Sequence, residues 1–486
     1  MKIVSLLFVL FSAGVLSALQ LPGIFSDNMV IQRDQEIRVW GKGKPGDRVT
    51  VTFKGKNVEG VVDKKGNFMV KLPAFQASAE PAEMVVKCGR FSKELKNVLV
   101  GDVWLCAGQS NMQWYIDGIT EKKKYLSQID QPLLRVFDIR YAWNRTPQFY
   151  HKPHSPKNSP ATWRVSNMKN AQQFSAVGFI TGLTILQKVN VPVGLISIAV
   201  GGGRIEAFCA PDSFDKVKGM PGSLRKKFKE SCKNFLTKKD EELMKEKQRY
   251  PLAIYNGMCA PILPFNIRGI LWYQGEENYR DGITYLPKLK AFAYTMRRGF
   301  KNPELPIYSV MLPPWEYNND SPNDKVPQVW MAQQRWVQSD PHSDLISTTD
   351  CGDINSVHPM SKEPLSLRLA DLVLYREYGI GKADVLTPMA KRATLRGKTV
   401  VVEFFDPQPL QTVDRKAVSH LELAGADGRF YPAAGSIKGN LLEVACPYVA
   451  KPEKIRFAFD CIAIHNLINQ RGIPVAPFEL SINKGR

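Results

Sequence analysis

Between residues 98 and 385, apolar runs of strand length alternate with segments of helical periodicity, and this alternation constrains the fold more than any other feature of the sequence. Strands that are apolar on both sides are typical of a parallel sheet whose two faces are covered by helices. The runs occupy residues 103–106, 193–198, 269–273, 307–311 and 345–348. The pattern therefore predicts an α/β domain built on a parallel sheet.

Shorter runs on either side of this segment alternate apolar and polar residues between turns, which is typical of antiparallel strands. Examples are residues 49–53 and 68–72 before the segment, and residues 399–405 and 441–444 after it. We therefore expect a β-sandwich-like domain over 19–97, the α/β domain over 98–385 and a C-terminal β domain over 386–486. Alternatively, the late strands complete the first β domain.

The first 18 residues have the pattern of a secretory signal peptide. Lys2 supplies a basic charge, residues 3–11 are apolar, and small residues follow as far as Ala18. The apolar run is shorter than the roughly 20 residues that a membrane helix needs, and no later run of the sequence is long and apolar enough. We therefore expect cleavage near Ser17 or Ala18, and a secreted or periplasmic protein without a membrane span.

Charge and cysteine content exclude few classes of function. The formal net charge is +20, but no run of five or more basic residues occurs. We interpret the excess as a lysine-rich surface rather than a nucleic-acid site. The eight cysteines form no Cys-x-x-Cys pair, so a zinc ribbon is not indicated. In an exported protein we expect a minority of them to form disulfides. The sequence indicates no metal and no cofactor, and it leaves the oligomeric state open.

Residues with catalytic chemistry follow four of the apolar runs. They are Ser110, Gly201, Gln274 and His358. Because the carboxyl ends of parallel strands meet at one edge of a sheet, we expect these residues to share a cleft. Acyl transfer requires a hydroxyl nucleophile, an imidazole base and N–H donors for the oxyanion. Singly, each residue has a structural alternative, such as a helix N-cap for Ser110. Together they predict a serine hydrolase.

The same segments resemble the sialate O-acetylesterase family, a group of SGNH hydrolases that are serine esterases with a flavodoxin-like sheet. The resemblance covers nearly the whole mature chain. Its strings are Gly108-Gln109-Ser110-Asn111-Met112, Gly201-Gly202, Trp272-Tyr273-Gln274-Gly275-Glu276 and His358-Pro359. The first and third strings are fairly specific, whereas Gly-Gly and His-Pro alone are not. The resemblance implies a flavodoxin-like SGNH hydrolase core, flanked here by N- and C-terminal β domains.

The resemblance also implies roles for individual residues. Ser110 would be the nucleophile and His358 the base. The backbone N–H groups of Ser110 and Gly201 would help to form the oxyanion hole. The third donor would be Gln274, with Asn278 as the alternative. We further expect two cleft residues, Arg204 and Glu276, to contact the substrate.

The group that orients His358 is not indicated by the resemblance. The family commonly has an Asp two or three residues before the His, where this chain has Ser356 and Asn355. Asp353 could orient the imidazole from the same loop, Asn355 could hold its tautomer, or Ser110 and His358 could act as a dyad. We favour Asp353, because an acidic group also stabilises the imidazolium. On this hypothesis Asp353→Asn lowers turnover sharply.

Together these observations predict a secreted serine esterase that removes O-acetyl groups from carbohydrate, with O-acetylated sialic acid as the favoured substrate. The alternatives are an acetylxylan-type esterase and a glycan-binding module with a degenerate catalytic site. The expected partner is an acetylated glycan, and no nucleic acid is expected. Arg204, beside the glycine turn, could attract a carboxylated sugar.

Overall fold

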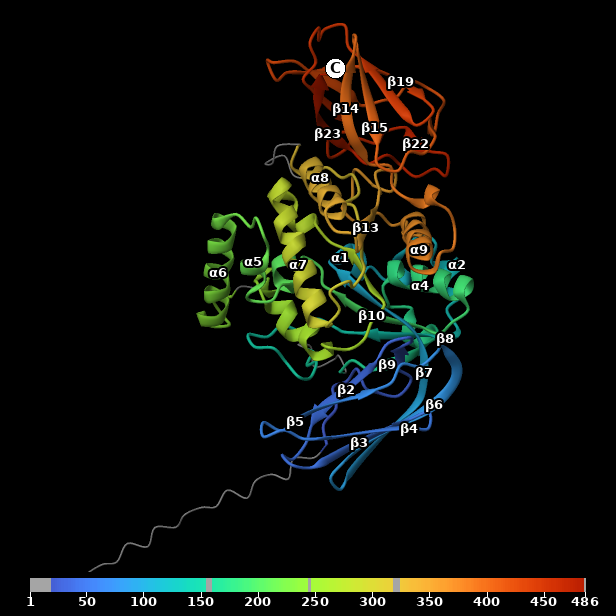
Figure 1. The fold of residues 1–486 in the computed structure, drawn as a ribbon, viewed down its shortest axis with the longest axis vertical. Helices are drawn as coiled ribbons and strands as arrows, with labels where there is room; N and C mark the ends of the chain where they lie inside the picture. Colours follow the sequence, from blue (N-terminus) through green and yellow to red (C-terminus); the bar gives the residue numbers. More distant parts are fainter. Residues whose placement is uncertain (1–18, 154–159, 244–245, 318–323, 485–486) are drawn as a thin grey trace, which may run out of the picture.

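The computed structural model describes residues 19–153, 160–243, 246–317 and 324–484 (Figure 1). The predicted signal peptide lies outside these residues. An α/β region occupies the middle of the molecule, with an N-terminal β region at one end and a C-terminal β region at the opposite end (Figure 1). Within the described ranges, no helix combines the length and the apolarity that a bilayer crossing requires.

Five of the six parallel strands in the central sheet lie in the spatial order β10-β7-β11-β12-β13. Numbered among themselves along the chain, these five strands have the order 2-1-3-4-5. The strands are β7 (Phe91–Gly108), β10 (Val193–Ala199), β11 (Gly269–Tyr273), β12 (Ile307–Val310) and β13 (Ser343–Ile346). Beyond β10 lie β8 (Gln131–Asp138), which is parallel to it, and β9 (Trp163–Ser166), which is antiparallel to β8. The sheet is therefore mixed, because β9 adds an antiparallel edge that the periodicity did not predict.

Side chains of β7 alternate between two apolar layers, as the pleat of a strand requires. Val103 and Leu105 belong to the same cluster as residues of α7 (Tyr285–Gly299) and α8 (Lys325–Gln338). Trp104 and Cys106 belong to a second cluster, with residues of α4 (Ala176–Val189) and α9 (Glu363–Tyr378). Both faces of the sheet are therefore buried, which explains why the strands read as continuous apolar runs.

The remaining helices are short, apart from α6 at the side of the molecule. They are α1 (Ser110–Gln113), α2 (Lys122–Leu126), α3 (Met168–Ala171), α5 (Ser213–Lys216) and α6 (Gly222–Thr237). Two 3₁₀ segments, η2 (Ile205–Phe208) and η6 (Glu276–Thr284), follow β10 and β11. These segments begin at the carboxyl edge of the sheet, where α1 also begins.

The N-terminal β region shares strand β7 with the central sheet. Its other strands are β1 (Val30–Gln32), β2 (Ile37–Lys42), β3 (Arg48–Phe53), β4 (Lys56–Val61), β5 (Asn67–Leu72) and β6 (Ser78–Cys88). The first half of β7 pairs with β6 and β1, and its second half pairs with β10 and β11. The expected boundary at residue 97 therefore falls inside one continuous strand.

The C-terminal strands form a sheet of their own, in the order β18-β17-β21-β23-β14-β15-β20-β19, beside a pair β16-β22. They are β14 (Ala390–Arg396), β15 (Thr399–Phe404), β16 (Leu410–Thr412), β17 (Leu421–Ala424), β18 (Phe430–Pro432), β19 (Ala434–Lys438), β20 (Leu441–Ala445), β21 (Lys454–Phe457), β22 (Leu467–Asn469) and β23 (Phe478–Lys484). Among the described residues they pair only with one another, so they do not complete the N-terminal β region.

The C-terminal β region contacts the loops at the carboxyl edge of the central sheet. The backbone N–H of Trp315 donates to the carbonyl of Cys461 over 3.0 Å. The hydroxyl of Thr349, just after β13, lies 3.0 Å from the Nε2 of His465. Burial lowers the pKa of His465 to about 4, so this imidazole is neutral at pH 7. The C-terminal region thus holds the loops that follow β12 and β13.

All eight cysteines are free thiols, so the expectation of some disulfides is wrong. The reason is their position, because most of them are buried side chains within the apolar clusters, where free cysteine packs as a small apolar residue. Cys106 lies on β7 in the middle of the sheet, for example, and Cys232 lies on α6.

Candidate active site

The end of β7 is shaped by a glycine at which no other residue fits. Gly108 has a φ of +151°, and an added Cβ would lie 2.0 Å from the carbonyl oxygen of Tyr273 at the end of β11. Only glycine allows this close approach. The chain then turns directly into α1, which places Ser110 at the carboxyl edge of the sheet.

Ser110 and His358 form a hydrogen-bonded pair. The Ser110 Oγ lies 2.8 Å from the His358 Nε2, within reach for proton transfer. His358 comes from the loop between β13 and α9, and its ring stacks on Trp114 with 5.0 Å between centroids. Burial and the charge of Lys362 hold the pKa of His358 below its ordinary value. The imidazole is therefore neutral at pH 7 and can accept the hydroxyl proton.

Asp353 does not contact the imidazole in this arrangement. Its Oδ1 accepts the backbone N–H of Asn355 over 3.0 Å, and the side chain is exposed. No hydrogen bond joins either Asp353 or Asn355 to His358 in the described part of the chain. The physical reason is local, because a carboxylate that caps its own loop turn is directed to the backbone two residues ahead.

Gly201 lies beside the nucleophile, as predicted. A Cβ added to Gly201 would be 3.7 Å from the Cβ of Ser110. The N–H of Gly201 donates to the Oε1 of Gln113 over 2.9 Å, so this donor is satisfied by a side chain of α1. The N–H of Ser110 occupies the first position of α1, where helix geometry provides no intrahelical acceptor.

Gln274 and Asn278 are buried in a polar network that uses their amide hydrogens. The Gln274 Nε2 donates to Gln109, to the carbonyl of Gly203 and to the Oδ1 of Asn278. The Asn278 Nδ2 donates to Glu206 over 3.0 Å and to Asp281 over 2.7 Å. The hydrogens of both amides are therefore already used within this network, and neither is directed at Ser110.

Gln109, which the sequence reasoning did not select, has a free amide donor beside Ser110. Its Oε1 accepts from the Nε2 of Gln274 over 3.0 Å and from the N–H groups of Gly275 and Glu277 over 3.2 Å each. Two of these donors are backbone groups, which fixes the oxygen's position and hence that of Nε2. Among the described residues the Nε2 has no acceptor, and Gln109 lines the cleft. In the sequence, only its position directly before Ser110 could have indicated that Gln109 lies at the site.

Asn111 connects the nucleophile to the loop that carries His358. Its Nδ2 donates to the Glu276 Oε1 over 2.6 Å and to the Val357 carbonyl over 2.9 Å. Its Oδ1 accepts from the buried Lys362 Nζ over 2.6 Å. Burial lowers the pKa of Lys362 to about 8 and raises that of Glu276. The predicted substrate contact Glu276 thus faces the cleft and also supports Asn111.

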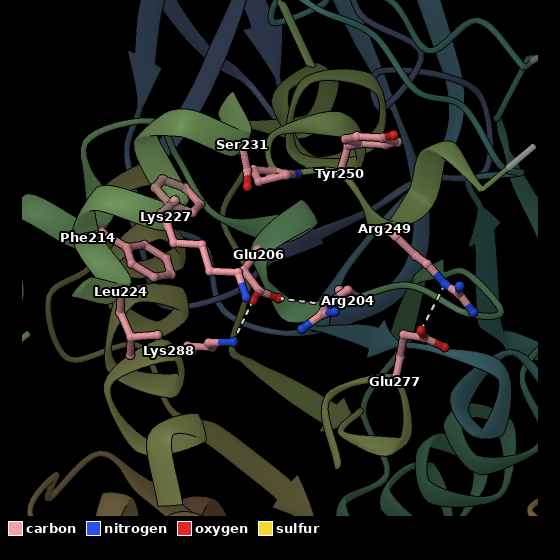
Figure 2. Close-up of a pocket in the computed structure, with 12 residues that line it drawn as sticks. Arg204, Glu206, Phe214, Leu224, Lys227, Ser231, Arg249, Tyr250, Glu277 and Lys288 are labelled. Atoms are coloured by element: carbon pink, nitrogen blue, oxygen red, sulfur yellow. Dashed lines mark hydrogen bonds and ion pairs between the residues drawn. The ribbon is translucent and has the colours of Figure 1, made fainter. Parts of the chain in front are cut away.

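The pair opens into a cleft of about 600 Å³. Its lining includes Gln109, Ser110, Gly202, Arg204, Arg249, Glu276, Glu277, Asn278, Tyr279, Arg280, Trp315 and His358. A smaller chamber of about 250 Å³ adjoins it, because Arg204, Arg249 and Glu277 line both (Figure 2). In the described residues, no three His, Cys, Asp or Glu side chains gather as metal ligands would.

Arg204 contacts two carboxylates of the protein itself, and Figure 2 shows the one from Glu206. Its guanidinium lies 3.5 Å from Glu206 and 3.6 Å from Asp281. Lys288 contacts the same two carboxylates at 2.6 Å each. Burial alone would raise the pKa of Glu206, but the charges of Lys288 and Arg204 outweigh it and lower the pKa to about 2. Two cations therefore balance two carboxylates here.

The chain is similar in sequence to a family of carbohydrate esterases. A family model described as "Carbohydrate esterase, sialic acid-specific acetylesterase" matches residues 100–374, more than half of the chain. Sialate O-acetylesterase of Homo sapiens is 25% identical over 406 residues, covering 74% of this chain and 70% of that protein. The enzyme of Mus musculus is 25% identical over 440 residues, covering 80% and 79%.

A solved structure is similar over nearly the whole length. A carbohydrate acetylesterase from Xanthomonas citri superposes with a TM-score of 0.83 at 28% sequence identity. The superposition covers 95% of this chain and 99% of that one, so it includes both flanking β regions as well as the sheet that carries Ser110.

Proposed function

Because the chain belongs to the family of carbohydrate esterases described as sialic acid-specific acetylesterases, and is thus a carboxylic ester hydrolase, we propose that it removes O-acetyl groups from sialic acid-containing glycans. The observation that carries the proposal is the 2.8 Å contact between Ser110 and His358 within the segment that matches the family. The strand order 2-1-3-4-5 supports the further assignment of a flavodoxin-like SGNH hydrolase core.

The reaction begins with proton transfer from the Ser110 hydroxyl to the His358 Nε2. The Oγ attacks the carbonyl carbon of the acetyl ester, and the carbonyl oxygen becomes an oxyanion. His358 then gives the proton to the sugar oxygen, the ester bond breaks, and an acetyl-serine remains. Water attacks this intermediate while His358 takes its proton, and acetate leaves as Ser110 regains its hydrogen.

The oxyanion would be held by three donors: the N–H groups of Ser110 and Gly201 and the Nε2 of Gln109. Gly201 contributes once the Gln113 side chain turns aside, because that side chain accepts its N–H in the free protein. Gln109 replaces Gln274 and Asn278 in this role, since the hydrogens of both these amides are already used. The Ser110 N–H and the Gln109 Nε2 need no such rearrangement, and donors fixed in advance are effective because they need no reorganisation during the reaction.

We propose that His358 acts as the base without a carboxylate bound to its Nδ1, the ring nitrogen that does not face Ser110. Stacking on Trp114 and the neighbouring charge of Lys362 support a neutral, oriented imidazole. Ser110 and His358 would therefore work as a dyad, with Asn111 holding the two loops together through the Val357 carbonyl.

The proposal is tested by acetate release. The wild type should hydrolyse a chromogenic acetyl ester, and Ser110→Ala should not; equal rates would reject the esterase site. Release is then compared between O-acetylated sialic acid and acetylated xylan. Faster release from sialic acid supports the proposed substrate, whereas acetate from xylan alone would assign an acetylxylan-type esterase.

We also propose that the protein is exported, on the pattern of residues 1–18. Expression of the full chain in a host with a secretory pathway, followed by N-terminal sequencing of the product, tests this. A mature protein that begins close to residue 19 in the exported fraction is expected. An uncleaved protein retained in the cytoplasm would reject export.

A further inference from the structure

We infer that Arg280 gives the catalytic cleft a subsite for the carboxylate of an acidic sugar. The inference rests on the proposed function, because it assumes that an acetylated sugar occupies the cleft beside Ser110. It names the group that would distinguish an anionic sugar ester from a neutral one.

Three guanidinium groups line the cleft, and two of them already have carboxylate partners. Arg204 contacts Glu206 and Asp281. Arg249 forms an ion pair with Glu277 at 2.8 Å and another with Glu246. A ligand carboxylate at either position would meet a cation whose charge is already balanced, so neither group would discriminate strongly between charged and neutral sugars.

Arg280 differs because no carboxylate pairs with it in the described part of the chain. Its one hydrogen bond runs from Nε to the hydroxyl of Tyr279 over 2.9 Å. An arginine has five N–H donors, so the four on its terminal nitrogens remain available. Paired N–H groups in this planar fork match the two oxygens of a carboxylate, which makes arginine well suited to such recognition.

Arg280 lies beside an aromatic group that forms one wall of the cleft. Its guanidinium carbon lies 5.5 Å from the centroid of the Tyr279 ring. Tyr279 packs on Tyr317, which in turn packs on Trp315, with centroid distances of 5.1 and 4.7 Å. Tyr279 and Trp315 are half-buried and line the same cleft as Ser110. Aromatic walls with a few polar groups are typical of small-ligand sites.

The arrangement changes the expectation for Arg204. Its charge is balanced by Glu206 and Asp281, which Lys288 also contacts; Figure 2 shows Arg204, Glu206 and Lys288 of this group. Arg204 therefore organises η2 and η6 at the cleft, and Arg280 is the specificity-determining arginine. Burial also favours this division, because Arg280 is exposed and a ligand can reach it.

The test is a selectivity ratio. kcat/KM is measured for an O-acetylated sialic acid and for an O-acetylated neutral sugar, using wild type, Arg280→Gln and the matched control Arg249→Gln. One charge-assisted contact corresponds to about a 10- to 100-fold effect. We expect the ratio of anionic to neutral substrate to fall by that factor in Arg280→Gln and to stay within about twofold of wild type in Arg249→Gln.

Two further measurements support the ratio. One changes the substrate instead of the protein, so it does not depend on how the variant folds, and the other measures binding instead of turnover. The methyl ester of the sialic acid carboxylate should lower the wild-type rate by the same factor and should lower the Arg280→Gln rate no further. Inhibition by the deacetylated acidic sugar should weaken in Arg280→Gln by a similar factor. An unchanged ratio in Arg280→Gln, or an equal fall in Arg249→Gln, overturns the inference while leaving the esterase assignment intact. If wild type releases acetate from no sugar ester, the proposed function and the inference fail together.

Discussion

The Nε2 of His358 lies 2.8 Å from the Oγ of Ser110, although the two residues are 248 positions apart in the chain. The contact arises because β7 and β13 are parallel strands of one sheet and end at the same edge.

The activity should persist below the ordinary titration range of histidine. His358 acts as a base only when neutral, and burial together with the charge of Lys362 lowers its pKa from 6.5. The acidic limb of kcat/KM against pH should therefore have its midpoint below 6.5. The measurement is a pH profile with a chromogenic acetyl ester, and a midpoint at or above 6.5 would contradict the assignment.

Lys362→Met should move that limb to higher pH. Lys362 has a pKa of about 8, so it is charged throughout the acidic limb, and removing the charge makes protonation of His358 easier. A lower melting temperature is also expected, because Asn111 loses a partner. A variant that is destabilised but keeps the wild-type midpoint would give Lys362 a purely structural role.

Asp353→Asn should change kcat by no more than about twofold, as is usual for exposed substitutions. The carboxylate caps the Asn355 N–H and has no contact with the imidazole. Replacing a carboxylate that orients a catalytic histidine can cost roughly 10⁴. Steady-state kinetics therefore separates the two cases, and a large loss would restore the sequence-based hypothesis that Asp353 is the orienting acid.

Gln109→Glu should lower kcat by about 10²–10³, the usual cost of one oxyanion donor. Glutamate keeps an oxygen for the N–H groups of Gly275 and Glu277, so the local fold should survive. The kinetics should be accompanied by a far-ultraviolet spectrum and a melting curve. Wild-type kcat in a folded variant would remove Gln109 from the oxyanion hole.

Asp102→Ala should reduce the free energy of unfolding by about 1–3 kcal/mol, because it removes a fully buried acceptor and leaves the buried donors around it unsatisfied. Asp102 is fully buried and accepts from Arg33, Gln32, Arg268 and Tyr378. Urea denaturation measures the change. The control is Asp34→Ala, since Asp34 is an exposed partner of the same Arg33 and should cost less than about 1 kcal/mol. Equal effects would contradict the assigned role of Asp102.

The sequence predicted the parallel strands and the meeting of Ser110, Gly201 and His358, because periodicity and strand ends are local features. It did not predict which side-chain amides keep an N–H group that is not already hydrogen-bonded within the protein. Gln109, Gln274 and Asn278 look alike in the sequence, and their roles depend on partners more than 70 positions away or on backbone groups. Arg204 was likewise selected for its position, whereas its use is decided by Asp281 in another segment.

The boundary predicted at residue 97 shows a second kind of feature that the sequence alone does not reveal. Asn97 has a φ of +56°, and the register of β6 against β7 shifts nearby. Asparagine tolerates this left-handed conformation, and the strand is locally irregular there. In the sequence, such an irregularity looks like the end of one domain and the start of the next. The strand nevertheless continues, because its second half finds new neighbours in β10 and β11.

That continuity of β7 has a consequence for cooperativity. The strand β7 belongs to the N-terminal sheet in its first half and ends just before the nucleophile in its second half. No hinge therefore separates the N-terminal β region from the α/β region, and these two regions should unfold together. The C-terminal sheet, which the chain enters near residue 386, shares no strand with the central sheet and is joined to it through loop and side-chain contacts such as Thr349–His465, so its unfolding should be coupled less tightly to that of the rest.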